Sequence, residues 1–208
     1  MKCKLIVIEG LDGSGKSTQG ELVANELSAK LISFPDYNSR SCELVKMYLS
    51  GEMSQNLNDI NAYAASSFYA VDRYASYKMH WQNDYQEGKM IIATRYVTSN
   101  AIHQMVKLDC SLWENYLDWL YDFEYNKLGL PIPDKIIFLN MDRDIANRLI
   151  LQRDREMDIH EKNTEYLKKC ELTAKYCCEK FGWSIVNCFD DGLPLDKNII
   201  KNKIISLI

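Results

Sequence analysis

The chain has 208 residues, which suffices for one sizeable hydrophobic core but leaves too little length for a second full domain. Acidic residues outnumber basic residues by 29 to 25, and the net charge of −4 argues against broad binding to nucleic acid or to a membrane surface. Any phosphate that the protein recognises should therefore be bound by a local group of positive charges.

The N-terminal region does not match a signal peptide, since residues 5–8 form an apolar run of four residues that stops at Glu9. No apolar run approaches the roughly 18 residues that a transmembrane helix requires. The seven cysteines are odd in number and lack C-x-x-C spacing, which favours reduced thiols in the cytoplasm. A metal site built from cysteine and histidine is not expected at this spacing.

A phosphate-binding motif follows the first predicted strand. The apolar run at residues 4–9 is followed by Gly10, Gly15, Lys16 and Ser17, which match the pattern G-x-x-x-x-G-K-[ST] at the start of a predicted helix. A strand, a glycine-rich loop and a helix in this order are typical of a P-loop. A glycine-rich turn that binds nothing is the alternative, and the presence of both flanking elements argues against it.

Each residue type in this loop contributes separately to phosphate binding. Gly10, Gly13 and Gly15 allow positive φ angles and let backbone N–H groups approach phosphate oxygens closely. Lys16 can place a cation on the β and γ phosphates, and the Ser17 hydroxyl can bind Mg²⁺. The positive end of the following helix dipole points at the same anion.

The next segment continues the alternation of helix and strand. A helix at 18–28 precedes a short strand at 31–34, which Pro35 ends, and a second helix is predicted at 41–51. The polar loop at 36–40 lies between these last two elements. Since ligands in open α/β sheets bind beyond the carboxyl ends of the strands, this loop is a candidate part of the site.

A long helix rich in aromatic side chains is predicted at residues 59–84, and most of these aromatic side chains are expected in the core. Tyr69 and Arg73 are four residues apart and therefore share one helical face. An aromatic plane beside a planar donor group is suited to grip one nucleotide base. A Tyr–Arg stack at the protein surface is the alternative.

A buried strand at 89–93 leads directly to Thr94 and Arg95, and a helix is predicted to begin near Thr98. Arg95 should lie at the sheet edge from which the phosphate loop also emerges, where an arginine is suited to clamp a phosphate. The segment at 111–127 is predicted to be an amphipathic helix. Its surplus of aromatic residues could form a dimer surface, although the core is the expected place for them.

The C-terminal part begins with a strand at 135–139 and a helix that carries Arg148. The densely charged stretch at 152–161 is predicted to be an exposed lid whose arginines could close over transferring phosphates. A solvated helix end is the alternative for this stretch. The remaining predicted elements are a helix at 161–181, a strand at 183–187, an acidic turn at 190–192 and a terminal helix.

Five parallel-type strands thus alternate with helices, and the candidate phosphate-binding residues meet at one sheet edge. This order predicts a three-layer α/β/α P-loop NTPase fold with a five-stranded parallel sheet and a short lid. A single P-loop domain is expected to span residues 1–208, with the lid at about 152–161.

Taken together, these motifs resemble the thymidylate kinase (dTMP kinase) family over nearly the whole chain. The resemblance is carried by the phosphate loop at 10–19, Phe34-Pro35, the segments at 69–73 and 95–100, and the lid end at 158–161. It implies transfer of the γ-phosphoryl group from ATP to dTMP, with Mg²⁺, to give dTDP and ADP. ATP and dTMP are then the expected partners, and a homodimer is expected because the family is usually dimeric.

The resemblance implies that side chains from two predicted helices bind the thymine base. Tyr69 would stack on thymine, and Arg73 would donate hydrogen bonds to its carbonyl edge. Asn100 would also contact the base, with support from Ser99.

The phosphate and sugar of dTMP are assigned in the same way. Arg95 would hold the dTMP phosphate, and Asp12 would lie between that phosphate, the 3′-hydroxyl and the metal. His103 stands near the sugar 2′ position, where relatives usually have Tyr or Phe. The resemblance therefore specifies the base more firmly than it specifies discrimination against ribonucleotides. His160 and Glu161 would reach dTMP from the lid.

The remaining roles fall to the phosphate loop and the lid. The residues that would bind ATP are Gly10, Gly13, Ser14, Gly15, Lys16, Ser17, Thr18 and Arg148. The residues that would act in catalysis are Asp12, Lys16, Arg95, Arg153 and Arg155. The lid arginines are included because Gly13 stands where one branch of the family has an arginine. Ser17 would ligate Mg²⁺, and Arg148 with the turn at 190–192 is the candidate adenine contact.

Several positions depart from the family pattern. Thr94 stands where relatives commonly have the aspartate of Asp-Arg-Tyr, and Asn140 stands where an aspartate is often found. Glu9 and Asp12 are the acids that remain near the loop, so we expect a kinase with weakened handling of Mg²⁺. Many relatives also have a phosphate-binding arginine just after Pro35, and in this chain that contact could fall to Arg40 or be lost.

Two alternatives compete with the interpretation of the chain as a dTMP kinase. The chain could be a kinase for another pyrimidine nucleotide or for a deoxynucleoside, although Arg95 favours an acceptor that already carries a phosphate. It could also be a nucleotide-binding regulator that has lost catalysis, which Thr94 and Asn140 would favour. The lid arginines argue against the regulator, because groups that stabilise charge in a transition state have little use in a binder.

Overall fold

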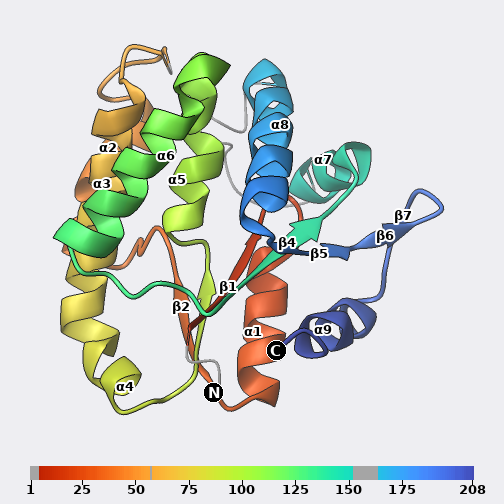
Figure 1. Ribbon diagram of the computed structural model, residues 1–208. Coiled ribbons are helices and arrows are strands. Elements are labelled where there is room, and N and C mark those ends of the chain that lie inside the picture. The colour runs from red at the N-terminus through yellow and green to blue at the C-terminus, as the bar shows by residue number, and fades with distance from the viewer. Residues whose placement is uncertain (1–4, 57, 152–163) are drawn as a thin grey trace.

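The computed structural model describes residues 5–56, 58–151 and 164–208. Within these residues, five parallel strands form one sheet in the order β2-β3-β1-β4-β5 (Figure 1). The strands are β1 (Leu5–Gly10), β2 (Lys30–Ser33), β3 (Ile91–Thr94), β4 (Lys135–Asn140) and β5 (Ser184–Asn187). This topology confirms the predicted fold class.

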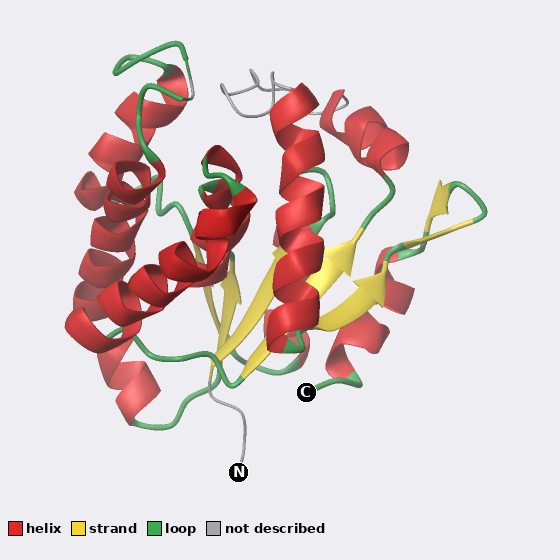
Figure 2. Ribbon diagram, turned by 45° about the horizontal axis from the view of Figure 1, so that its top comes forward, coloured by secondary structure: helices red, strands yellow, loops and turns green. Residues whose placement is uncertain are grey.

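Helices pack on both faces of the sheet and complete three layers (Figure 2). One face is covered by α1 (Lys16–Glu26) and α9 (Lys197–Ile205). The other face is covered by α3 (Ala62–Ser76), α5 (Val97–His103), α6 (Trp113–Tyr121) and α8 (Thr164–Phe181). The remaining helices are α2 (Glu43–Ser50), α4 (Gln82–Gln86) and α7 (Arg143–Leu151).

Burial on both faces explains why strand β1 is apolar over most of its length. Leu5 and Val7 point into the core beneath α3, α5, α6 and α8, whereas Ile6 and Ile8 point into the core beneath α1 and α9. All four side chains are completely buried. A strand that is covered on both sides needs apolar residues at successive positions, because neighbouring side chains point to opposite faces.

The prediction of one uninterrupted helix at 59–84 is wrong. The helix starts at Ala62, because the Asn61 side chain caps it by accepting a 2.9 Å hydrogen bond from the Ala64 amide. α3 then passes through a π-helical segment, Tyr77–Trp81, before α4. The extra residue of a π-turn rotates the following side chains. Here Trp81 becomes buried against Tyr77, with ring centroids 4.6 Å apart.

The predicted helix at 111–127 is also divided. It opens with a 3₁₀ turn, Cys110–Leu112, continues as α6, and ends in a π-helical segment, Asp122–Lys127. Within that last segment, Glu124 points into the interior and is completely buried. A sequence pattern with a period of 3.6 residues does not reveal such changes of helical type.

The acidic turn predicted at 190–192 is present, but it lies at the tip of a small hairpin of β6 (Phe189–Asp190) and β7 (Leu193–Pro194), which projects from the sheet (Figure 1). The predicted lid at 152–161 lies outside the described residues.

The six cysteines within the described residues are free. In the same part of the chain, no helix combines the length and the apolar character needed to cross a membrane.

Candidate active site

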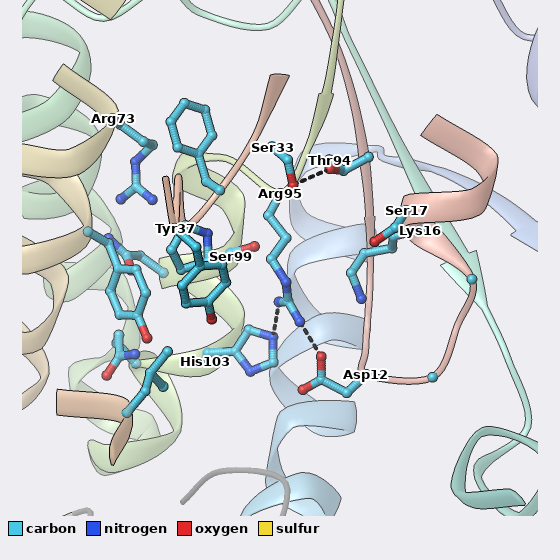
Figure 3. A pocket seen from close by; sticks show the side chains of 18 of the residues that line it. Asp12, Lys16, Ser17, Ser33, Tyr37, Arg73, Thr94, Arg95, Ser99 and His103 are labelled. Carbon is cyan, nitrogen blue, oxygen red and sulfur yellow. Dashed lines mark hydrogen bonds and ion pairs between the residues drawn. The ribbon is translucent and has the colours of Figure 1, made fainter. Parts of the chain in front are cut away.

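A cavity of about 580 Å³ lies at the carboxyl edge of the sheet, where the loops after β1, β2 and β3 meet α3 and α5 (Figure 3). This volume is in the range of small-molecule sites. Its lining includes Asp12, Gly13, Gly15, Lys16, Ser17, Thr18, Ser33, Phe34, Pro35, Tyr37, Tyr69, Arg73, Thr94, Arg95, Ser99, Asn100, His103 and Gln104. The structure therefore brings the predicted phosphate loop and most of the predicted acceptor residues into one cavity.

The phosphate loop has the backbone that its glycines were expected to provide. Gly13 and Gly15 have φ angles of 82° and 85°, in the left-handed region that glycine adopts most easily. A Cβ atom on Gly13 would lie 2.6 Å from the carbonyl oxygen of Ala146, so α7 also excludes a larger residue there. Lys16 is buried beside the loop, and its Nζ atom donates a 2.7 Å hydrogen bond to the carbonyl oxygen of Leu11.

Two predicted loop residues lie behind the cavity rather than on its wall. Gly10 packs so closely against Ser14 and Leu139 that a Cβ atom would collide with both. The Ser14 hydroxyl is buried and has no hydrogen-bond partner among the described residues. These two positions shape the turn, while Lys16 and Ser17 line the cavity.

Arg95 is the central cation of the cavity. Its φ angle of 66° is in the left-handed region, which a residue with a long side chain adopts at an energetic cost. Nη2 forms an ion pair with the Asp12 carboxylate, and Nη1 donates to Nε2 of His103 over 2.9 Å (Figure 3). The guanidinium is thus held from both sides, between the loop after β1 and helix α5.

Burial opposes the positive charge of Arg95, but the carboxylates of Asp12 and Glu9 outweigh this effect and raise its pKa above the usual value. The guanidinium therefore stays charged throughout the physiological range. A permanent cation at this depth in a cavity is suited to bind an anion such as a phosphate.

His103 is fixed by its neighbours rather than by solvent. Its Nδ1 atom lies 3.6 Å from the sulfur of Cys170, and its ring stacks on Tyr166 at a centroid distance of 6.4 Å. Because an arginine can only donate, Nε2 must accept the hydrogen bond from Arg95. The ring proton of the neutral histidine then belongs on Nδ1, facing the sulfur.

Glu9 is completely buried beneath the phosphate loop. Its carboxylate accepts hydrogen bonds from the hydroxyls of Thr98 and Ser99, at 2.8 and 2.7 Å, and from the Gly10 amide at 3.1 Å. Of the two acids expected near the metal, Glu9 thus serves to join β1 to α5, while Asp12 lines the cavity. Ser99, which lines the cavity wall, is thus hydrogen-bonded to the buried Glu9 carboxylate.

Thr94 and Asn140, the two departures from the family pattern, have different surroundings. The Thr94 hydroxyl donates a 2.8 Å hydrogen bond to the Ser33 hydroxyl, and both residues line the cavity. The Thr94 methyl group faces Gly20 of α1 so closely that a Cβ atom at Gly20 would collide with it. Asn140 does not line the cavity, and its amide donates to the Asn187 side chain at 2.8 Å.

The far end of the cavity is aromatic and polar. Tyr69 packs edge-on against Tyr48, with ring centroids 6.3 Å apart. Arg73 and Asn100 line the cavity together, and both are bound from behind by the buried Glu124 carboxylate. This end combines a ring with donors and acceptors, as a site for a nucleobase requires.

Gln104 and Phe34 also line this end, and the sequence reasoning gave neither of them a site role. The amide oxygen of Gln104 is buried without a hydrogen-bond partner among the described residues, although polar groups in protein interiors are usually paired. Gln104 directly follows His103, the last residue of α5, and this place next to a predicted site residue was the available signal.

Other predicted residues lie away from the cavity or outside the described ranges. Arg148 donates a 3.2 Å hydrogen bond to the carbonyl oxygen of Gly192, so the two candidate adenine contacts do lie together. Arg40 is exposed and is not part of the cavity lining. The lid residues outside the described ranges are Arg153, Arg155, His160 and Glu161.

The comparisons with known proteins agree on one family. The family model described as thymidylate kinase matches residues 8–188. The thymidylate kinase of Mycobacterium tuberculosis is 31% identical over 197 residues, covering 88% of this chain and 90% of that protein. That of Caenorhabditis elegans is 26% identical over 211 residues, covering 95% and 88%. The structure of the Candida albicans thymidylate kinase aligns with a TM-score of 0.77, at 23% identity over 99% of this chain and 91% of that chain, which supports the fold.

The hydrogen bond from Arg95 to His103 predicts that the ring proton of the neutral histidine lies on Nδ1 and not on Nε2. At pH 8, where an ordinary histidine is neutral, nitrogen-15 NMR should show the Nδ1–H tautomer for His103, assigned through the loss of its signals in His103→Gln. In Arg95→Met the donor is absent, and the ring should shift toward the Nε2–H tautomer. An Nε2–H tautomer in the wild-type protein would contradict the geometry.

Proposed function

This chain belongs to the thymidylate kinase family, and from that premise we propose that it transfers the γ-phosphoryl group of ATP to dTMP. A phosphate oxygen of dTMP attacks the γ-phosphorus of ATP, and the bond from that phosphorus to the β-phosphate bridging oxygen breaks. The products are dTDP and ADP. The proposal rests chiefly on one observation, that Lys16 of the phosphate loop and Arg95 after β3 line the same cavity.

The placement of these two cations supports a direct transfer. Lys16 would hold the β and γ phosphates of ATP, and Arg95 would hold the phosphate of dTMP. Asp12 fixes Arg95 from the loop that binds ATP, so the two phosphate sites are linked by one ion pair. Such a reaction depends on positioning and on neutralisation of charge, and it requires no covalent intermediate.

The acceptor end supports a thymine base. Tyr69 would stack on the ring, while Arg73 and Asn100 would bind its polar edge and Ser99 would support Asn100. His103 would lie near the sugar, where it also holds Arg95. An acceptor without a phosphate would make no use of Arg95 as a phosphate-binding cation, which disfavours a deoxynucleoside.

The donor set near the phosphate loop fits Mg²⁺. The part of the chain that the structure describes contains no group of three or more His, Cys, Asp or Glu side chains arranged to hold a metal. Mg²⁺, however, commonly takes few protein ligands and completes its shell with water and substrate phosphates. Ser17 would ligate the ion, with Asp12 close by. When bound, the ion would neutralise charge on the transferring phosphates.

We also propose that the lid arginines, Arg153 and Arg155, add positive charge during transfer and that His160 and Glu161 approach dTMP, as the family pattern implies. The rest of the proposal is a single domain over residues 1–208, a homodimer, and a cytoplasmic location, which the free cysteines favour. Arg148 beside Gly192 is proposed to contact the adenine.

The proposed activity is tested by ADP release with Mg²⁺ and ATP in the presence of dTMP, dUMP, UMP or thymidine. We expect turnover to be fastest with dTMP and absent with thymidine, because Arg95 needs a phosphate. Arg95→Met should lower the rate with dTMP by at least about tenfold, since a charge-assisted hydrogen bond contributes roughly 1.5–3 kcal/mol. Binding of ATP and dTMP without any turnover would instead favour the alternative that the protein is a nucleotide-binding regulator without catalytic activity.

Thr94 is expected to weaken the use of Mg²⁺, because its hydroxyl faces the cavity without a negative charge. Thr94→Asp should raise turnover at limiting Mg²⁺ by about fivefold, the equivalent of roughly 1 kcal/mol. Thr94→Asn, which has the same shape without the charge, is the matched control and should give no increase. If aspartate and asparagine have equal effects, the missing carboxylate does not limit this enzyme.

A further inference from the structure

Glu124 is a buried carboxylate just behind the base end of the cavity. Its side chain is completely inaccessible, and it is not part of the cavity lining. Its Oε1 and Oε2 atoms accept hydrogen bonds from Nη2 and Nε of Arg73 at 2.6 and 2.7 Å. Oε1 also accepts a 3.0 Å hydrogen bond from Nδ2 of Asn100. One anion thus holds both of the polar side chains assigned to the base.

The contact with Glu124 determines which atoms of Arg73 remain for a ligand. The carboxylate engages Nε and one hydrogen of Nη2, and Nη1 lies 3.4 Å from the carbonyl oxygen of Tyr96. A guanidinium has five N–H donors, so N–H groups remain on Nη1 and Nη2. Because Arg73 lines the cavity, these groups are the donors that it can present there (Figure 3).

The same anion determines the orientation of the Asn100 amide. Nδ2 donates to Oε1 of Glu124 and also to the carbonyl oxygen of Ser66, at 3.1 Å. Both partners can only accept, so the NH₂ group must face them and both of its hydrogens are used. The amide oxygen is then the atom that Asn100 can offer to the cavity, and it is an acceptor.

We propose that Glu124 is a positioning residue that selects a 4-oxo pyrimidine over a 4-amino pyrimidine. Arg73 supplies a donor for an oxygen at position 4, and Asn100 supplies an acceptor for the hydrogen on N3. A 4-amino pyrimidine has a donor at position 4 and an unprotonated N3, so both contacts would oppose it. This inference rests on the proposed function, since it concerns the base of the same acceptor.

Removing the charge of Glu124 should disturb this selection without removing the side chains that contact the base. In Glu124→Gln, one amide oxygen replaces two carboxylate oxygens, and in either orientation the NH₂ group faces an N–H donor of Arg73. Asn100 cannot relieve this opposition by turning its amide over, because its oxygen would then face the carbonyl oxygen of Ser66. The guanidinium of Arg73 must therefore shift, which displaces the donor for position 4 and should weaken the preference for the 4-oxo base.

A matched control is available in the same buried cluster. The Tyr116 hydroxyl contacts the Ser66 hydroxyl at 2.7 Å and the backbone carbonyl of Asn100 at 3.2 Å. It is completely buried, as Glu124 is, but among the described residues its hydroxyl bonds to Ser66 and to the Asn100 backbone rather than to the Arg73 or Asn100 side chain. Tyr116→Phe should therefore lower stability while leaving the selection of the base unchanged.

The test compares equilibrium binding of dTMP and 5-methyl-dCMP by calorimetry, which does not depend on turnover. The two nucleotides share the methyl group, sugar and phosphate and differ at positions 3 and 4 of the base. Wild type and Tyr116→Phe should prefer dTMP strongly, and Glu124→Gln should reduce the ratio of affinities by about tenfold or more.

An unchanged ratio in folded Glu124→Gln, or an equal loss for both nucleotides, would overturn the proposal. Equal binding of both nucleotides by the wild-type protein would also overturn it, even if the variant failed to fold. Failure of the proposed kinase activity would be recognised separately, as binding of dTMP without release of ADP.

Discussion

The ion pair between Asp12 and Arg95 joins the two loops on which the site depends. Strands β1 and β3 are neighbours in the sheet, so their carboxyl ends place the phosphate loop and the turn at Arg95 side by side. The left-handed backbone at Arg95 directs its side chain toward the loop, and Asp12 and His103 hold the guanidinium there. A strained conformation persists when its surroundings determine it, and strain of this kind is common at functional sites.

Behind the cavity, two buried carboxylates are likewise held by several hydrogen-bond donors each, and one of them forms a buried ion pair. Glu9 is bound by hydroxyls of α5, and Glu124 is bound by Arg73 and Asn100. Burial opposes the charge of Arg73, but Glu124 more than compensates and raises its pKa. Buried ion pairs contribute little net stability compared with apolar residues of equal size. Their use here is better explained by the fixed geometry that they give to donors and acceptors on the cavity wall.

Much of this architecture follows from local sequence patterns. The glycine spacing predicts the phosphate loop, and the apolar runs that alternate with helical periodicity predict the parallel sheet. Tyr69 and Arg73 are four residues apart, and Arg95 directly follows a strand, so their places could be predicted as well. The π-helical segments at Tyr77–Trp81 and Asp122–Lys127 could not, because they are set by the packing of Trp81 and Glu124 in the interior.

The contacts that refine the site are long-range and lack a local signature. Glu124 lies 51 residues from Arg73 in sequence, and Asp12 lies 83 residues from Arg95. The resemblance to a known family indicated the role of Asp12, since the glycine pattern alone made it a spacer. Neither source indicated Glu124, whose burial behind the cavity is visible in the fold alone, whereas Gln104 could have been suspected because it directly follows His103.

The central claim is that Arg95 binds the acceptor phosphate while the phosphate loop binds the donor. It is tested most directly by calorimetric binding of dTMP and of a non-hydrolysable ATP analogue to wild type and Arg95→Met. We predict that the variant binds dTMP about 10- to 100-fold more weakly, since a charge-assisted hydrogen bond contributes roughly 1.5–3 kcal/mol, and binds the ATP analogue almost unchanged. Equal losses for both ligands, or an unchanged affinity for dTMP, would contradict this division of the site.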